Sequence, residues 1–472
     1  MMKPIGFPIF SSENKKLTDK QTILSEPIPS LDLLERACYQ LSKKITSLIN
    51  KSNFIHIVCG QGNNGADGLC LARILSFHGY QIKVSIINVF SKKTIEYERQ
   101  LELLNHTNVS IQLYQDTELP KFLPQEVIID AILGSGLNQK ISGFFQTIIQ
   151  EINQSGNIIM SIDNPSGLGT WDDFDGEYVH ANFTFCLGTI SPSVLNRKYE
   201  QNLIPIDIGL DLSSANPLGW YLTKKSSQDF INTLIPQKNK HHHKGSKGHA
   251  LLIGGNKNMH GAIILAAQMA NKIGTGNVTV FSHPDSLKYV SHLPEVQFYG
   301  SELNGKATDY FNFEGYQALG IGPGLDCNAA TTAFLSFLLG KRNLPPLVID
   351  ADALNIISKN RNLLPKVPVN SVLTPHPKEL ERLFGKFNNE NEKWKTLSEF
   401  ARKSGIHILA KDTYSILFCN DGEIIVNGTG TEKLAKGGSG DKLTGIITGF
   451  VAQGIKPKHA AICGMFLLNE LA

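Results

Sequence analysis

The pentapeptide GGSGD at Gly437–Asp441 places a carboxylate directly behind a run of small residues. The apolar pattern that follows, LTGIITGF, predicts a helix that begins here, with Asp441 on its first turn. Glycines let backbone N–H groups approach an anion, and the start of a helix adds partial positive charge. Such a site suits phosphate chemistry, because Asp441 can take a proton from a hydroxyl group. The alternative interpretation is that Asp441 only caps the helix.

A second loop, GQGNNG at Gly60–Gly65, follows an apolar strand and fits the spacing GxGxxG. An ordinary dinucleotide site also needs an acidic residue after the next strand, and no acidic residue lies between Asp67 and Glu96. The oxygen-bearing side chains of Asn63, Asn64 and Asp67 are instead typical ligands of a cation. The alternative is a turn in which an asparagine side chain caps the following helix.

Two further acidic residues stand where buried strands are predicted to end. Asp130 follows VII and leads into AILGSGL, and Asp163 follows IMSI and leads into NPSGL. Ligands of open α/β sheets bind at the carboxyl ends of the strands. We therefore expect Asn64, Asp130 and Asp163 to converge on one crevice, although each acidic residue alone could be a loop cap.

These residues need a scaffold, and the alternation of apolar strands with helical patterns predicts an α/β protein with parallel, doubly wound sheets. The pattern is interrupted by the polar stretch 235–249, so we place a domain change near residue 220. The triple histidine His241–His243 in this stretch is interpreted as part of a solvated connector, because adjacent histidines rarely share one metal. The predicted strands are Phe54–Cys59, Ile82–Val89, Val127–Ile132, Asn157–Ile162, Asn182–Leu187, Ala250–Ile253, Asn277–Phe281, Ala318–Ile321, Leu347–Ile349, Val372–Leu373 and Ile406–Leu409, with a hairpin formed by Ile416–Phe418 and Glu423–Val426.

Composition narrows the class of protein. The 472 residues are 41% hydrophobic and 18% charged, which is typical of a globular protein of two or three domains. A net charge of +3 gives no support for a nucleic-acid partner, and no apolar run is long enough to cross a membrane. The seven cysteines form no CxxC pair. We therefore expect reduced thiols and a cytoplasmic protein without a membrane or nucleic-acid partner.

The motifs GNNGADG, DAILGSGL and DNPSGL, in this order, resemble the N-terminal domain of the NAD(P)H-hydrate repair enzymes. The resemblance implies a Rossmann-like epimerase domain, over residues 1–219, that interconverts the R and S forms of hydrated NADH or NADPH (NAD(P)HX). It implies a catalytic role for Asp163 and a potassium ion near Asn64, Asp130 and Ser166. The implied substrate contacts are Asn63, Asn64, Gly65, Ala66, Asp67, Gly134, Ser135, Gly136, Leu137, Asn138, Gln139, Lys140 and Asp163.

The second half carries HKGSKGHALLIGG, IGPGL, DADAL, TPHPKE and GGSGD, which resemble the dehydratase domain of the same family. The resemblance implies a ribokinase-like α/β domain, over residues 220–472, that uses magnesium and ADP as co-substrate. It would dehydrate S-NAD(P)HX to NAD(P)H and release AMP and phosphate. Homo-oligomers are also implied. The implied residues are Asp441 as catalytic base, Ala262, Gly324, His376 and Asp441 for the substrate, and Lys411, Asp412, Thr413, Tyr414, Ser415 and Gly440 for the nucleotide.

This chain departs from the family pattern at several positions. Ala66 replaces a glycine, Asp412 replaces the glycine after Lys411, and no lysine follows Leu187 until Lys198. The chain also ends where the family pattern continues, so a truncated C-terminus is one interpretation. Two alternatives to a bifunctional isomerase and lyase therefore stay open. One is a dehydratase with a catalytically silent N-terminal binding domain, and the other is a ribokinase-like kinase of small molecules.

Overall fold

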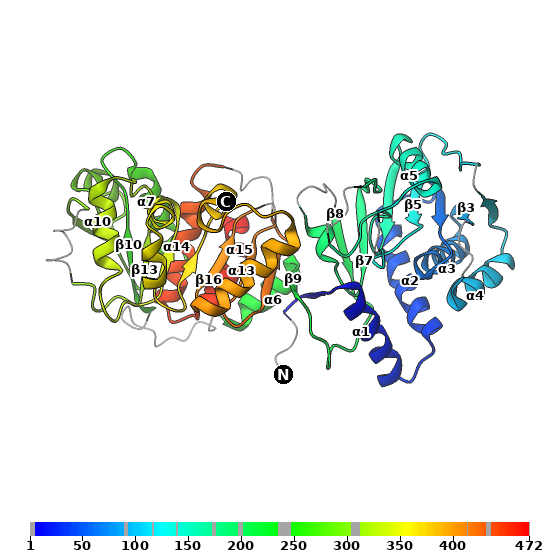
Figure 1. Cartoon of the computed structure of the whole chain (residues 1–472), viewed down its shortest axis with the longest axis horizontal. Helices are drawn as coiled ribbons and strands as arrows, with labels where there is room; N and C mark the ends of the chain where they lie inside the picture. The colour runs from blue at the N-terminus through cyan, green and yellow to red at the C-terminus, as the bar shows by residue number, and fades with distance from the viewer. Residues whose placement is uncertain are drawn as a thin grey trace. The chain divides into compact units, whose positions relative to one another are not determined.

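The computed structural model describes residues 5–88, 93–115, 118–137, 140–171, 176–196, 202–234, 247–303, 312–412, 414–430 and 436–471. The chain divides into two compact units. The N-terminal unit is Phe7–Leu218 with Asn389–Asn391, and the C-terminal unit is Gly219–Asn388 and Glu392–Ala472 with Met1–Gly6. Each unit is built around its own sheet, as Figure 1 shows in blue to green for the first and green to red for the second.

Seven of the eight described strands of the N-terminal unit, all except β1, form a sheet in the order β4-β3-β2-β5-β6-β7-β8. Every neighbouring pair in this sheet is parallel. The strands of this unit are β1 (Phe7–Ile9), β2 (Phe54–Cys59), β3 (Gln81–Ile87), β4 (Ser110–Tyr114), β5 (Val127–Ala131), β6 (Ile158–Ile162), β7 (Phe183–Leu187) and β8 (Asn202–Ile206). The helices are α1 (Ser12–Ser25), α2 (Ser30–Thr46), α3 (Asn63–Phe77), α4 (Ile95–Asn105), α5 (Phe144–Gln154) and the 3-10 turn η1 (Pro192–Leu195).

Both faces of the sheet are buried at its central strands, which is why β2, β5, β6 and β7 are mostly apolar rather than alternating. Ile128 and Ile129 are neighbours on β5, yet they belong to different cores. Ile129 packs in the core that includes Leu41 of α2, whereas Ile128 packs in the core that includes Ile149 of α5. The sheet therefore has helices on both sides, as the doubly wound prediction requires.

The C-terminal unit has a mixed sheet, in which the strands from β9 to β12 run in the order β9-β18-β17-β16-β15-β14-β13-β10-β11-β12. The pairs β16–β17 and β17–β18 are antiparallel, and the other pairs between these strands are parallel. The strands are β9 (Gly219–Leu222), β10 (His249–Ile253), β11 (Asn277–Ser282), β12 (Val296–Gly300), β13 (Ala318–Ile321), β14 (Leu347–Ile349), β15 (Val372–Leu373), β16 (His407–Ala410), β17 (Ile416–Phe418) and β18 (Ile424–Asn427).

Helices cover both faces of this second sheet as well, because Ala318 packs with α14 and α15 whereas its neighbour Leu319 packs with α10 and α11. The α-helices are α6 (Lys224–Leu234), α7 (His260–Lys272), α8 (Leu287–Val290), α10 (Ala329–Leu338), α11 (Ala351–Lys359), α12 (Pro377–Phe384), α13 (Glu390–Ser404), α14 (Ser439–Ala452) and α15 (Pro457–Leu471), with 3-10 turns η3 (Pro284–Ser286) and η4 (Arg361–Lys366). No described helix is both long enough and apolar enough to cross a membrane.

Two close backbone approaches shape the C-terminal unit. Helices α14 and α7 cross at Gly445, where an added Cβ would lie 2.0 Å from the carbonyl oxygen of Ala266. Residues from the start of the chain also belong to this unit. Ile5 packs against its core, and a Cβ on Gly6 would lie 2.3 Å from the carbonyl oxygen of Tyr221.

The strand predictions are confirmed within one or two residues for each predicted strand whose full range is described. The hairpin is confirmed too, with Gly422 at a φ of +91° in its turn. The prediction Ile82–Val89 runs one residue past the described segment that ends at residue 88. The sequence analysis missed β1, β4, β8, β9 and β12, which are short or partly exposed strands with weak apolar patterns.

Candidate active sites

A cavity of about 760 Å³ lies in the N-terminal unit, bordered by the loops that follow β2, β5 and β6. These strands are neighbours in the parallel sheet, so their carboxyl ends meet at one edge. Helix α1 also contributes to the lining, with Lys15 and Asp19. The predicted contact residues on the cavity wall are Asn63, Asn64, Asp67, Gly134, Ser135, Gly136, Leu137, Lys140 and Asp163. Asn138 and Gln139 lie outside the described residues.

In the loop after β2, Gly60 and Gly65 must be glycines because neighbouring backbone atoms leave no room for a side chain. A Cβ on Gly65 would lie 1.9 Å from the carbonyl oxygen of Gly60, and a Cβ on Gly60 would lie 2.1 Å from that of Ile132. Ala66 is different, because it lies within α3 and its backbone N–H donates to the carbonyl oxygen of Gly62 at 3.0 Å. Its backbone is helical, without a positive φ, and its methyl group packs in the core, so an alanine fits at this position.

Asn64 stands out among the polar residues of the wall. Its side chain is buried, and neither its amide nitrogen nor its amide oxygen has a hydrogen-bond partner among the described residues. A buried amide without a partner costs free energy, on the order of 1–3 kcal/mol. The cavity wall therefore offers a donor and an acceptor that a ligand or a cation can satisfy.

Asp130 and Ser166 lie behind the wall rather than on it, and both are fully buried. The Asp130 carboxylate accepts hydrogen bonds from the Ser166 N–H at 2.9 Å, the Ser166 hydroxyl at 2.5 Å and the Ser161 hydroxyl at 2.8 Å. The Leu133 N–H donates to the Ser166 hydroxyl at 2.8 Å. Burial raises the pKa of Asp130 above its usual range. These bonds tie the loop after β5 to the loop after β6, and so they hold Asp163 in place.

Asp163 has a left-handed backbone, with a φ of +65°, at the point where the chain leaves β6. One carboxylate oxygen pairs with Lys15 Nζ, and the other lies 3.4 Å from the backbone N–H of Ser135. Lys15 was not predicted from the sequence. The family pattern has a lysine after β7, whereas this cation comes from a helix 148 positions earlier in the chain than Asp163.

Three carboxylates surround the Lys15 ammonium. Burial alone would lower the pKa of Lys15, but the charges of Asp163 and Asp19 outweigh burial and raise it. Burial, together with the charge of Asp163, raises the pKa of Asp67 to about 8. Burial also raises the pKa of Asp19. Near neutral pH, Asp67 is therefore mostly protonated and can donate a proton, whereas Asp163 faces the cation.

In the C-terminal unit, the GGSGD segment begins α14 as expected. Gly438 is the N-cap, with a φ of +89° that favours glycine, and Asp441 lies on the first turn. The first backbone N–H groups of a helix lack partners within the helix, so this end can bind an anion. Burial and the negative charge of Asp350 raise the pKa of Asp441 to about 6, against the opposing charge of Lys411.

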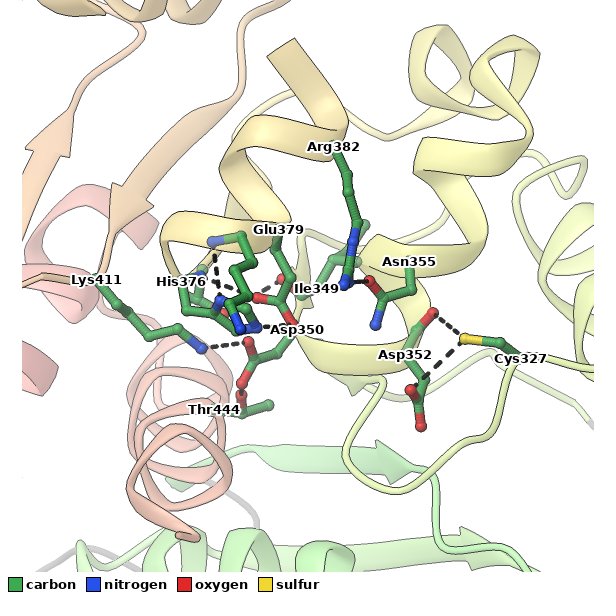
Figure 2. A network of polar contacts seen from close by, with 12 residues as sticks. Cys327, Ile349, Asp350, Asp352, Asn355, His376, Glu379, Arg382, Lys411 and Thr444 are labelled. Carbon is green, nitrogen blue, oxygen red and sulfur yellow. Dashed lines mark hydrogen bonds and ion pairs between the residues drawn. The ribbon is translucent and has the colours of Figure 1, made fainter. Parts of the chain in front are cut away.

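An ion pair between a partly buried lysine and a buried aspartate lies close to this helix, as Figure 2 shows. Lys411 Nζ lies 2.6 Å from Asp350 Oδ1, and the Thr444 hydroxyl donates to Asp350 Oδ2 at 2.9 Å. Burial alone would raise the pKa of Asp350, but Lys411 and Thr444 lower it below its usual value. A Cβ on Gly440 would lie 3.1 Å from Lys411 Nζ. Because Gly440 has no side chain, the Lys411 ammonium can lie close to the backbone at the start of α14, where a phosphate would bind.

His376 begins α12 and forms a capping box with Glu379 (Figure 2). Its Nδ1 accepts a hydrogen bond from the Lys378 N–H at 3.1 Å, and its Nε2 lies 3.2 Å from Glu379 Oε1. Burial and the charge of Lys411 lower the pKa of His376. Burial raises the pKa of Glu379 to about 7. The imidazole is half exposed, so the capping role leaves part of the ring open to a ligand.

The remaining predicted residues of this unit fall in two groups. A Cβ on Gly324, at a φ of +61°, would lie 3.3 Å from the Ala262 methyl group, so these two residues are neighbours. Lys411 follows β16, and Ser415 precedes β17 and accepts a hydrogen bond from the Asn427 N–H at 2.9 Å. Asp412 and Tyr414 belong to the same loop. Thr413 and His241–His243 lie outside the described residues.

Comparison with known proteins gives matches to both halves of the chain. A family model described as NAD(P)H-hydrate dehydratase matches residues 250–472, and one described as YjeF-related protein N-terminus matches residues 30–193. The bifunctional NAD(P)H-hydrate repair enzyme Nnr of Dictyoglomus turgidum is 31% identical, over 97% of this chain and 92% of that protein. The enzyme of the same name from Coxiella burnetii is 29% identical, over 98% of this chain and 93% of that protein.

Among solved structures, the ADP/ATP-dependent NAD(P)H-hydrate dehydratase of Bacillus subtilis, co-crystallised with ATP and Mg²⁺, is 29% identical. The match covers 52% of this chain and 86% of that chain, with a TM-score of 0.44.

Proposed function

Because the chain belongs to the family of bifunctional NAD(P)H-hydrate repair enzymes, we propose that it restores hydrated nicotinamide cofactors by two reactions. Residues 1–219 epimerise R- and S-NAD(P)HX, and residues 220–472 dehydrate the S form with ADP and release AMP and phosphate. The observation that carries the proposal is Asp441, a partly buried carboxylate on the first turn of α14 that the charge of the Lys411 ammonium influences.

In the dehydration, Asp441 accepts the proton of the hydrate hydroxyl while the hydroxyl oxygen takes the phosphoryl group of ADP. The bond between the ring carbon and the phosphorylated oxygen then breaks, phosphate leaves, and the neighbouring ring carbon loses a proton to solvent, which restores the double bond of the reduced nicotinamide ring. The N–H groups at the start of α14 and the Lys411 ammonium stabilise the negative charge of the transferred group. His376, Ala262 and Gly324 are the proposed contacts of the nicotinamide hydrate, and the loop from Lys411 to Ser415 with Gly440 is proposed to border the nucleotide.

In the epimerisation, Asp163 is the proposed base. Inversion at a hydrated carbon needs ring opening or proton transfer, and Asp163 stands on the cavity wall where it can exchange a proton with the substrate. The cavity of about 760 Å³ has the size of a pocket for a small-molecule cofactor. The carboxylate of Asp163 is fixed on both oxygens, one by Lys15 and one by Ser135.

A potassium ion held by Asn64, Asp130 and Ser166 would add fixed positive charge beside this cavity. The buried amide oxygen of Asn64, which has no partner among the described residues, supports such a site. Magnesium enters as the partner of the nucleotide phosphates rather than as a resident ion. We also propose a cytoplasmic homo-oligomer that takes NAD(P)HX and ADP as its small-molecule partners.

The test is recovery of the reduced-nicotinamide absorbance from a mixed R/S NADHX solution with ADP and magnesium. Full recovery is expected for the natural chain. Recovery that stops when the S form is consumed would mean a dehydratase beside a silent N-terminal domain. No recovery, with phosphorylation of an added small alcohol instead, would favour a kinase.

Asp441→Asn removes the base from the helix start and keeps the side chain's size. We expect dehydration to fall by at least about 100-fold, because positioned proton transfer contributes about 10²–10⁴-fold, while nucleotide affinity stays near that of the natural chain. Asp229→Asn, an exposed carboxylate on α6, is the matched control and should leave the rate unchanged. Normal turnover by the Asp441 variant would remove this residue from the mechanism.

A further inference from the structure

Lys15 is a cation in direct contact with the proposed base of the N-terminal site. Its ammonium pairs with Asp163, and both side chains line the cavity. Their side chains are only 18% and 11% exposed, so the pair is largely protected from solvent. A pair this buried interacts more strongly than a surface ion pair, because water screens it less.

The position of Lys15 is set by the backbone of α1 and not only by the reach of a long side chain. Ser11 caps α1, and the N–H of Ser12 lies 3.4 Å from the hydroxyl of Thr170. That hydroxyl donates to the carbonyl oxygen of Ser135 at 3.2 Å, and the Ser135 N–H in turn faces Asp163. The start of α1 is therefore connected to the same loop that holds the carboxylate.

The far part of α1 is fastened as well. The hydroxyl of Thr22, which is fully buried, accepts a hydrogen bond from the N–H of Asp211 at 2.9 Å. Thr18 and Thr22 are the buried residues of the helix. With both parts held, the helix cannot turn Lys15 away from the cavity without breaking several contacts.

Among the acidic groups around Lys15, Asp163 is the carboxylate with which it forms an ion pair. Asp163, Asp19 and Asp67 all lie close enough to influence it, but its direct ion pair is with Asp163. Asp67 has another neighbour, the Cys38 thiol at 3.7 Å. Without the ammonium, the Asp163 carboxylate would lose its ion-pair partner and would be held only by the N–H of Ser135.

We propose that Lys15 is a positioning residue of the epimerase site, which holds the Asp163 carboxylate aimed at the substrate. The inference rests on the proposed function, since it concerns the base of that reaction. It gives α1 a role in the chemistry of Asp163, which lies in the loop after β6. A purely structural ion pair, which only fastens α1 to the sheet, is the competing explanation.

The experiment compares Lys15→Met and Lys15→Arg with Lys20→Met, an exposed lysine on the same helix. Separated R and S hydrates are each converted by the full chain with ADP and magnesium. For Lys15→Met we expect kcat with the R hydrate to fall by about 100-fold, which matches the loss of an effective base, with KM changed by less than about threefold. Conversion of the S hydrate should stay at the natural rate. Lys15→Arg should recover part of the lost kcat, because it restores the positive charge.

Three results would overturn the inference. Unchanged R conversion by Lys15→Met would show that Asp163 needs no cation. Equal losses with both hydrates, together with a lower melting temperature, would show a structural pair. A rise in KM alone would show that Lys15 binds substrate and does not act through Asp163. If Lys15→Met does not fold, Lys15→Arg is judged by the same criteria. A fall in kcat with the R hydrate alone supports the inference, and a rise in KM alone contradicts it. Failure of the proposed function is distinct, since the natural chain itself would then not convert the R hydrate.

Discussion

At the scale of single residues, the pH dependence of dehydration should follow Asp441. This group must be ionised to accept a proton, and its pKa is raised to about 6. As the pH falls through about 6, Asp441 binds a proton and the rate falls; above that value the rate reaches a plateau. Initial rates with the S hydrate across this range test the prediction, with Asp229→Asn as the control. A rate that stays constant well below pH 6 would contradict it.

At the scale of elements, the close crossing of α14 and α7 positions the first turn of α14, which carries Asp441. Gly445→Ala would push a methyl group against the carbonyl oxygen of Ala266, at 2.0 Å before any shift. We expect a loss of roughly 1–3 kcal/mol in the free energy of unfolding and a lower dehydration rate. Gly261→Ala on α7 meets no atom within 4 Å and is the stability control. Equal denaturant midpoints for the two variants would contradict a tight crossing.

At the scale of the whole molecule, the two reactions should be separable because each unit has its own sheet and core. Asp163→Ala should stop conversion of the R hydrate and leave that of the S hydrate intact. Asp441→Asn should stop recovery of NADH from either hydrate, while R and S forms still interconvert, which chromatography of the hydrates can follow. A parallel loss of both reactions in Asp163→Ala would contradict the assignment of one reaction to each unit.

Sequence patterns were sufficient for much of this architecture. Strands such as β2 are mostly apolar because both faces of the sheet are buried there, so their positions could be predicted directly. Lys15 could not be found in this way, because α1 has little apolar patterning and its partner Asp163 is distant in the chain. The hydrogen bonds to the Asp130 carboxylate could not be predicted either, since no sequence spacing shows that Ser161 and Ser166 donate to it. Pairings between distant segments are properties of the packed fold.

The contribution of Ile5 and Gly6 to the C-terminal unit has a consequence for how a new chain matures. At about 5–20 residues per second, a ribosome makes Tyr221, against which Gly6 packs, at least roughly ten seconds after Gly6 itself. The N-terminal unit can fold during that interval, whereas Ile5 and Gly6 must wait for β9 to be synthesised. The C-terminal unit is therefore completed by residues that were synthesised before Phe7–Leu218 of the other unit.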